Sequence, residues 1–424
     1  MNRAIAPAVK QFPPLTMPGQ HVEVLPNGIT LHYLSAGHQP VCRLSLLFAG
    51  GIAEIGNQLT PRLTLASCTD ASLHYPHEKL ADILDFNGVH PGASAHSHFT
   101  SFNISMLNHR VSDVLPVMLD FLSSPEFPER QLTATCLAQK SQIATMRSDS
   151  SFIANEEFEL AMNGDSHPLT QPLVADPIEN FTPANAAALH QRLICPRRAH
   201  AFLSGLLSDK LIDDVRQTLG ALPSLGDGYE IDIKPYTHPS KPFTKVVDFE
   251  HTYQSAIAAG MSAIDRTHPD YINLRLTVMA LGGYFGSRLM TNIREEKGLT
   301  YGISSALLGC QEGAYVKIGA QCDKSYSKIV LDEIRNELFN LAANPPKGKE
   351  LERLKLFATT SLAEILDTPT AIMGYYSTQL LVGTPDDYFA DQQRAISTLT
   401  SDKIAEMATK WLDPDKLSAI IVGE

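Results

Sequence analysis

The chain has 424 residues, of which 44% are hydrophobic and 19% charged, and its formal net charge is −12. This length exceeds one ordinary domain and suits two domains of about 200 residues each, with ample material for a buried core. The acidic balance argues against a nucleic-acid-binding or anionic-membrane surface, because such surfaces need clustered Lys and Arg. No run of about 18 apolar residues occurs, so the sequence predicts no transmembrane helix.

The N-terminus carries no recognisable targeting signal. Residues 1–14 lack the uninterrupted apolar core of a signal peptide and the Arg- and Ser-rich composition of a transit peptide. The six cysteines are scattered, with no Cys-x-x-Cys pair, and buried free thiols are the simplest interpretation. We therefore expect a cytoplasmic protein.

The first half begins with strand patterns and continues with helices. Residues 22–34 and 42–48 are strand-like, and residues 111–122 carry apolar side chains at helical spacing. A helix that ends near Leu193 then leads into a short turn and an apolar strand that stops at Gly205.

A glycine- and proline-rich stretch separates two halves. Residues 220–242 contain three glycines and four prolines among polar residues, a composition typical of a linker. We therefore place an N-terminal half at residues 1–219 and a C-terminal half at residues 243–424.

The second half repeats the first in outline. It opens with strand patterns at residues 243–249 and 255–261. In each half the last strand ends at a glycine, and a proline stands nine residues before that glycine. The pairs are Pro196 with Gly205 and Pro414 with Gly423, and they lie 218 residues apart. This repeat indicates a duplicated architecture.

The order of these elements predicts the fold class. Residues 300–306 and 314–320 are strand-like, and a helical stripe follows between Tyr326 and Leu341. Runs of strands followed by several helices are typical of α+β folds. We expect two duplicated halves, each a mostly antiparallel sheet covered by helices.

Residues 284–301 contain the most informative pattern of the chain. Apolar residues share one helical face, and Gly298 offers the left-handed position that ends a helix directly before a strand. Arg294 thus lies in the last helical turn and Tyr301 at the start of the strand. Taken singly, Arg294 is a cation at the negative end of a helix dipole and Tyr301 an aromatic residue on a half-buried strand.

This segment resembles the arginine–tyrosine motif in the C-terminal half of pitrilysin/insulinase-like zinc peptidases of the bacterial processing-peptidase-like type. The resemblance extends over essentially the whole chain after about Gly19, is most specific at residues 285–301, and implies two halves facing each other like an open clamshell. It also implies that Arg294 binds a substrate carbonyl and that the hydroxyl of Tyr301 donates a hydrogen bond to a tetrahedral oxyanion. Neither side chain can activate water, so the pair forms half of an active site.

The zinc-binding helix of that family has no counterpart in this sequence. The family carries an inverted His-x-x-Glu-His motif, which supplies two zinc ligands and the carboxylate base that hydrolysis needs. Residues 55–73 contain neither histidine nor glutamate. The two ligands and the base are replaced in our alignment by Leu63, Ala66 and Ser67.

The helix that carries the third ligand of the family lacks it as well. Residues 130–155 contain no glutamate, and Ser141 or Gln142 stands at the expected place. We therefore expect no metal in this chain and, by resemblance, zinc in a partner subunit.

Two groups of histidines are the alternatives for a metal site. His74, His77 and Glu78 stand in the order His-x-x-His-Glu, where the start of a surface helix is the simpler interpretation. His96 and His98 alternate along a predicted strand, and we favour a polar strand face lining a cavity over a ligand pair. A self-sufficient metallopeptidase would need one of these groups.

Three glycines precede the arginine–tyrosine segment. Gly282, Gly283 and Gly286 are too few to form the glycine-rich substrate loop of the non-catalytic subunit of mitochondrial processing peptidases. We interpret them as permitting close backbone approach and retain them as candidate substrate-binding residues.

The leading hypothesis is a non-zinc subunit of a heterodimeric metallopeptidase, inactive alone. A homologous zinc-bearing subunit would be its partner, and the two would enclose a chamber for unfolded peptides, with Arg294 and Tyr301 completing the partner's active site. The alternative is a catalytically inert structural or scaffold subunit, because members of the family without zinc ligands also form assembly cores of respiratory complexes. The retained arginine–tyrosine pair favours the first hypothesis.

Overall fold

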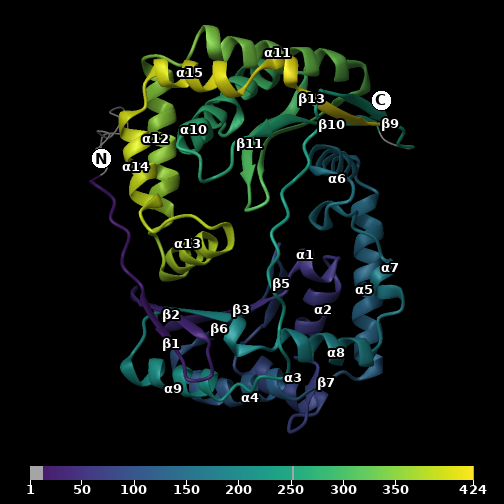
Figure 1. Cartoon of the computed structure of the whole chain (residues 1–424), viewed down its shortest axis with the longest axis vertical. Helices are drawn as coiled ribbons and strands as arrows, with labels where there is room; N and C mark the ends of the chain where they lie inside the picture. Colours follow the sequence, from purple (N-terminus) through teal and green to yellow (C-terminus); the bar gives the residue numbers. More distant parts are fainter. Residues whose placement is uncertain (1–12, 251–252, 424) are drawn as a thin grey trace, which may run out of the picture.

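The computed structural model describes residues 13–250 and 253–423, which form two halves, one above the other in Figure 1. Most of the N-terminal stretch judged to lack a targeting signal, residues 1–12, lies outside the described part. None of the helices described combines the length and the apolar character that crossing a membrane requires. All six cysteines are free, and four of them are buried.

The N-terminal half is built on a six-stranded sheet in the order β1-β2-β8-β3-β6-β5. Its neighbouring strands are antiparallel except for β2 and β8, which are parallel. The strands of this sheet are β1 (His21–Val24), β2 (Thr30–Ser35), β3 (Val41–Ala49), β5 (Gly92–Ala95), β6 (Phe99–Leu107) and β8 (Ala199–Gly205). A short pair, β4 (Ala71–Ser72) with β7 (Pro125–Glu126), stands apart.

Nine helices belong to the described part of this half. They are α1 (Ile52–Ile55), α2 (Thr60–Ser67), α3 (His77–Phe86), α4 (Val111–Ser123), α5 (Glu129–Arg147), α6 (Ser150–Asn163), α7 (Asp176–Glu179), α8 (Pro183–Leu193) and α9 (Asp209–Gly220). The alternation of β3 explains how they cover the sheet. Leu44 and Leu46 pack into the core beneath α4 and α9, while Arg43 and Ser45 point to the opposite, inner face.

The C-terminal half repeats this plan with a five-stranded sheet in the order β11-β12-β10-β13-β9. Its strands are β9 (Thr244–Val247), β10 (Gln254–Ala263), β11 (Thr300–Gly309), β12 (Ala314–Asp323) and β13 (Ser418–Val422). Again one neighbouring pair, β13 with β9, is parallel and the others are antiparallel.

The helices of the C-terminal half lie mainly on the outer face of its sheet (Figure 1). They are α10 (Tyr271–Gly282), α11 (Ser327–Ala343), α12 (Lys349–Glu364), α13 (Pro369–Val382), α14 (Tyr388–Thr398) and α15 (Ser401–Trp411), with a π-helix at Met290–Glu296. The prediction of two α+β halves with mostly antiparallel sheets is confirmed. Both proline-to-glycine units occupy the same position in their halves, leading into β8 and β13.

One helix from each half packs on the inner face of the sheet of the other half. α6 packs on β10 and β13, where Phe158 lies against Ala256 and Ala258. α13 packs on the N-terminal sheet, where Ile372 and Met373 join the apolar side chains of β2, β3 and β8. The two halves are therefore interlocked, and each sheet is covered on its inner face by a helix from the other half of the sequence.

The predicted linker begins at Gly220, the last residue of α9, and its residues 221–242 form no helix or strand but are held in place. Tyr236 donates its backbone N–H to the carbonyl of Glu312, and Thr237 donates to the carbonyl of Asn163. The aromatic ring of Tyr229 is buried against Gly50, whose φ is +114°. The linker thus runs through the contact between the halves.

Candidate functional site

The arginine–tyrosine segment folds as its sequence predicts. Leu289 and Ile293 are fully buried on one face of the helical stretch, and Gly298 adopts φ +64° just after the π-helix ends. β11 begins two residues later, at Thr300. The π-helical form was not predicted. Such a wider turn is often found at functional sites.

Arg294 and Tyr301 are brought together by this geometry. The Nε of Arg294 donates a 2.9 Å hydrogen bond to the carbonyl of Tyr301, and its guanidinium lies 4.9 Å from the ring centroid of Phe285. These contacts fix the guanidinium plane. Its two terminal nitrogens make no hydrogen bond to a residue that the structure describes, so they remain available as donors to a ligand.

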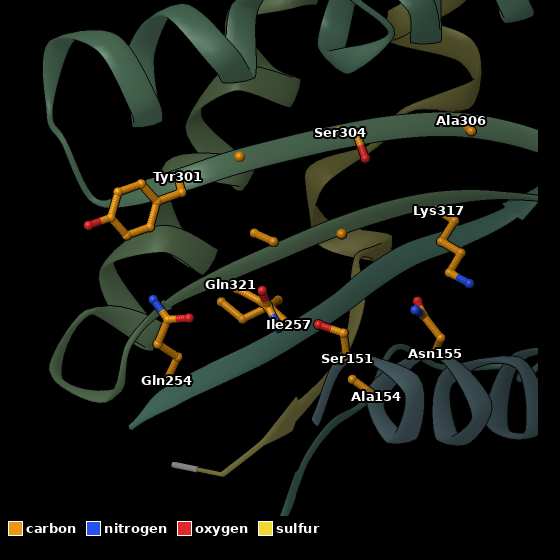
Figure 2. Close-up of a pocket in the computed structure, with 13 residues that line it drawn as sticks. Ser151, Ala154, Asn155, Gln254, Ile257, Tyr301, Ser304, Ala306, Lys317 and Gln321 are labelled. Carbon is orange, nitrogen blue, oxygen red and sulfur yellow. The ribbon is translucent and has the colours of Figure 1, made fainter. Parts of the chain in front are cut away.

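Tyr301 is 88% exposed and stands at one end of a pocket of about 600 Å³. Figure 2 shows Tyr301 on β11 at this end, Lys317 at the other end, and α6 as the opposite wall. The sheet contributes Ser304 and Gln321, and α6 contributes Ser151 and Asn155. No Asp, Glu or His belongs to the described lining, so these residues offer hydrogen bonds but no carboxylate or imidazole base for water.

The three glycines occupy different environments near this segment. Gly282 is buried where α10 crosses β11, and a Cβ there would lie 2.6 Å from the backbone nitrogen of Ser305. Close backbone approach explains that glycine. Gly283 is exposed and Gly286 half-buried, and none of the three lines the pocket beside Tyr301. Their contact with substrate stays a prediction.

Apolar packing occupies the region where the related peptidases carry zinc. Leu63 of α2 is buried against Ile143 of α5 and Ile178 of α7. Beside this cluster Arg62 donates a 3.1 Å hydrogen bond to Gln139, whose amide group donates to Gln142. These side chains do not fit a catalytic zinc ion, because an aliphatic cluster and amides bound to each other supply no ligand set.

The two other positions of the zinc alignment have equally unsuitable surroundings. Ser67 is buried with its hydroxyl lacking a hydrogen-bond partner among the described residues, and Ala66 has no ligand atom in its side chain. Ser141 uses its carbonyl to accept a hydrogen bond from Thr145 within α5. Across residues 13–250 and 253–423, no group of three or more His, Cys, Asp and Glu side chains is arranged to hold a metal ion.

The residues of the first alternative histidine group make separate contacts. His74 is exposed and bonds through Nδ1 to a carboxylate oxygen of Asp120 at 2.6 Å. The Nδ1 of His77, in the first turn of α3, lies 2.7 Å from the carbonyl of Asp70. Glu78 shares that first turn, as predicted for a surface helix start.

The prediction that His96 and His98 alternate along a strand is wrong. The two residues form the hairpin turn between β5 and β6, in which the N–H of His96 bonds to the carbonyl of Phe99. His96 faces a pocket beneath α13 and bonds to Ser101, whereas His98 faces a different pocket beside the linker. Because the chain turns between the two residues, their side chains point in different directions.

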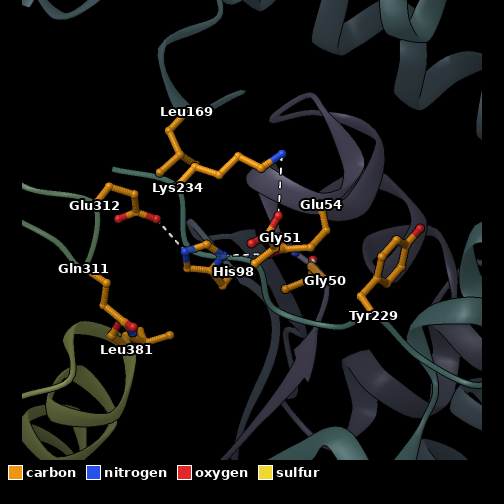
Figure 3. A network of polar contacts seen from close by, with 12 residues as sticks. Gly50, Gly51, Glu54, His98, Leu169, Tyr229, Lys234, Gln311, Glu312 and Leu381 are labelled. Atoms are coloured by element: carbon orange, nitrogen blue, oxygen red, sulfur yellow. Dashed lines mark hydrogen bonds and ion pairs between the residues drawn. The ribbon is translucent and has the colours of Figure 1, made fainter. Parts of the chain in front are cut away.

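His98 forms a buried bridge between the two halves. Its side chain is 2% exposed and lies between Glu54 of α1 and Glu312, which stands in the turn between β11 and β12 (Figure 3). Nδ1 donates to Glu54 at 2.6 Å, and Nε2 donates to Glu312. This bridge was not predicted, because its members come from three distant parts of the sequence.

The bridge is charged at neutral pH. Burial alone would lower the pKa of His98, but the hydrogen bonds to Glu312 and Glu54 outweigh burial and raise that pKa to about 9. Burial raises the pKa of each carboxyl, but the hydrogen bond from His98, further hydrogen bonds and the charge of the imidazolium together more than offset burial, so both pKa values lie below their usual range. The imidazolium and two carboxylates thus join the halves electrostatically.

Comparison with known proteins agrees with this architecture. Residues 180–356 match the family model described as the peptidase M16 inactive domain. A Bacillus subtilis protein named uncharacterized zinc protease YmxG is 23% identical over 298 residues, which cover 70% of this chain and 71% of that protein.

Solved structures share the fold over nearly the whole chain. A structure described as the peptidase M16 inactive domain from Pseudomonas fluorescens has a TM-score of 0.85 at 22% identity and covers 96% of this chain and 98% of its own. The periplasmic protease PqqL from Escherichia coli has a TM-score of 0.77 at 15% identity, covering 99% of this chain but 49% of PqqL. These findings confirm the pitrilysin/insulinase-like resemblance: residues 180–356 match the M16 inactive domain, and the whole chain shares the fold of M16-like structures.

Proposed function

We propose that this chain is the non-zinc subunit of a heterodimeric M16-type metallopeptidase and that it contributes Arg294 and Tyr301 to the active site of a zinc-bearing homologue. Unfolded peptides are its substrates, enclosed between the two subunits. The arrangement of Arg294 beside Tyr301 is the observation that carries the proposal. A guanidinium fixed through Nε, with two free terminal nitrogens, stands next to an exposed phenol at one end of the pocket of about 600 Å³.

The chemistry of these groups matches the role. The guanidinium presents donors to a peptide carbonyl, and the neutral phenol donates to an oxyanion as negative charge develops on it. A base and an electrophile are needed in addition, and the pocket described above offers neither. Zinc and its carboxylate base in the partner would supply both.

A tyrosine variant tests the assignment. The chain is co-expressed with a homologue that retains His-x-x-Glu-His, and hydrolysis of an unstructured fluorogenic peptide is measured with the purified complex. Tyr301→Phe removes one oxyanion donor and is expected to lower kcat by about 10²–10³-fold with little change in KM. Tyr326→Phe, at a second exposed tyrosine, is the control and should retain full turnover.

The same experiment separates this proposal from a purely structural subunit. A scaffold would hold the partner active irrespective of the phenol, so unchanged turnover of the Tyr301→Phe complex would reject the catalytic role. Arg294→Lys adds a second measure. Lysine keeps the charge but loses the planar donor pair, so KM and kcat are both expected to worsen.

A further inference from the structure

A second pocket, of about 500 Å³, lies between α13 and the inner face of the N-terminal sheet. Figure 1 shows α13 above this sheet, at the centre of the molecule. The floor includes Arg43 and Ser45 of β3 and Asn103 of β6, and the roof includes Gly374 and Ser377 of α13. No Asp or Glu is among the described residues that line it.

Arg43 is a half-buried cation without a counter-ion. It makes no hydrogen bond or ion pair with a residue in the described part of the chain. The pocket beside Tyr301 differs in this respect, since its Lys317 pairs with Glu159 at 2.8 Å. A guanidinium that has lost part of its hydration without gaining a carboxylate is a favourable partner for an anion.

The neighbouring groups suit an anion as well. The hydroxyls of Ser45 and Ser377 form no hydrogen bond within the described residues, so both are free to donate. His96 also faces the pocket, but burial lowers the pKa of its imidazole, and it is therefore neutral near pH 7. The positive charge of the pocket thus comes from Arg43.

Gly374 provides an independent indication that the space is kept open. It stands in the middle of α13, where glycine is unfavourable compared with alanine. A Cβ at this position would meet nothing within 4 Å, so close packing does not require glycine there. What glycine does is leave room in the roof of the pocket.

We propose that this pocket binds a carboxylate of a peptide, with Arg43 pairing to both carboxylate oxygens and Ser45 and Ser377 donating further hydrogen bonds. Ser94 in its wall belongs to β5, the last strand in the order of the sheet, and an edge strand is one of the places where extended peptides bind proteins. The peptide as source of the carboxylate rests on the proposed function. The binding of an anion by Arg43 is independent of the proposed function.

Peptide binding to the purified chain alone tests the inference, without a zinc partner. Three unstructured peptides of otherwise identical sequence, each labelled with an uncharged fluorophore that has no carboxylate, are compared by fluorescence anisotropy. The first carries a single Glu and an amidated end, the second Gln and a free carboxyl end, and the third Gln and an amidated end. Either carboxylate peptide is expected to bind about tenfold or more tightly than the third, and the comparison of the first two identifies the side chain or the terminus as the source.

Two variants address the pocket by different means. Arg43→Gln removes the charge, and Gly374→Leu adds a bulky side chain to the roof at a position where a Cβ meets no neighbour within 4 Å. Each should lower affinity for the carboxylate peptide by about tenfold or more. Arg335→Gln, which removes an equal charge from an exposed pair with Asp332 on α11, should leave it unchanged.

The outcomes are decisive and independent of the catalytic proposal. Equal affinity for all three peptides, or full carboxylate binding by a folded Arg43→Gln chain, would overturn the inference. Tyr301→Phe should bind the carboxylate peptide normally, so loss of turnover in the complex and loss of this subsite are separate results.

Discussion

Replacing Glu312 with glutamine tests whether the charged His98 bridge holds the two halves together. The substitution keeps the shape of the side chain and removes one of the two carboxylates that contact the imidazolium. Its partner Glu54 remains, so His98 stays hydrogen-bonded on the N-terminal side. The change therefore weakens the link across the halves and leaves the local structure of the hairpin turn in place.

The expected change in the free energy of unfolding follows from the pKa shift of His98. Its pKa rises from 6.5 to about 9 in the folded chain. At about 1.4 kcal/mol for each unit, the charged bridge contributes roughly 3 kcal/mol to the free energy of unfolding. Because Glu312 is one of two partners, Glu312→Gln should lower that free energy by about 1–2 kcal/mol when His98 is protonated.

The destabilisation caused by Glu312→Gln should decrease as the pH rises. Because the folded pKa lies above the unfolded value, the contribution of His98 is complete below about pH 6.5 and is lost as pH rises through about 9. Both carboxyl pKa values are lowered, so the two glutamates stay ionised at the lower of these pH values. Above pH 9 a neutral imidazole no longer offsets two buried carboxylates, and Glu312→Gln should become neutral or stabilising.

Urea unfolding followed by circular dichroism at about pH 6 and about pH 9.5 measures this difference. Since a chain with two halves need not unfold in one step, the midpoint of the first transition is compared. Glu230→Gln is the matched control, because its ion pair with Arg198 is exposed and should contribute under about 1 kcal/mol at either pH. A Glu312→Gln penalty that is equal at both pH values would refute the bridge.

Three further substitutions probe the packing around the lost zinc motif and the bridge. Ser67→Ala removes a buried hydroxyl without a described partner and should raise the unfolding free energy by up to about 1 kcal/mol, whereas a loss in urea unfolding would show that the hydroxyl is satisfied. Leu63→His places an imidazole against Ile143 and should lower the same free energy by about 2–4 kcal/mol. Added zinc should not restore the melting temperature of that variant. Gly51→Ala would put a Cβ 2.3 Å from the carbonyl of His96, so the melting temperature should fall sharply, and a shift under about 2 °C would contradict the close approach.

Local patterns in the sequence predict the arginine–tyrosine segment because its geometry is set by neighbours in the chain. Helical spacing buries Leu289 and Ile293, and Gly298 ends the helix by adopting a positive φ. Arg294 and Tyr301 are seven residues apart across this junction, so the junction itself brings them into contact. Long-range packing had only to leave that arrangement undisturbed.

The bridge could not be predicted in this way. Glu54, His98 and Glu312 meet only after the halves have docked, and Glu312 lies 214 residues beyond His98. The turn at 96–98 contains no glycine, proline or asparagine to mark it. Backbone groups of Gly50, Ile52 and Ala53 hold it instead, by donating to its three carbonyls.

The interlocking helices bring the N-terminal half beside Tyr301. α6 forms one wall of the pocket at that residue, through Ser151 and Asn155. α6 follows α5 almost directly, and α5 is held to α2 by the contact of Leu63 with Ile143. The aliphatic cluster therefore links α5, and with it α6, to α2. In this arrangement the pocket wall opposite Tyr301 is positioned by apolar contacts between α2 and α5.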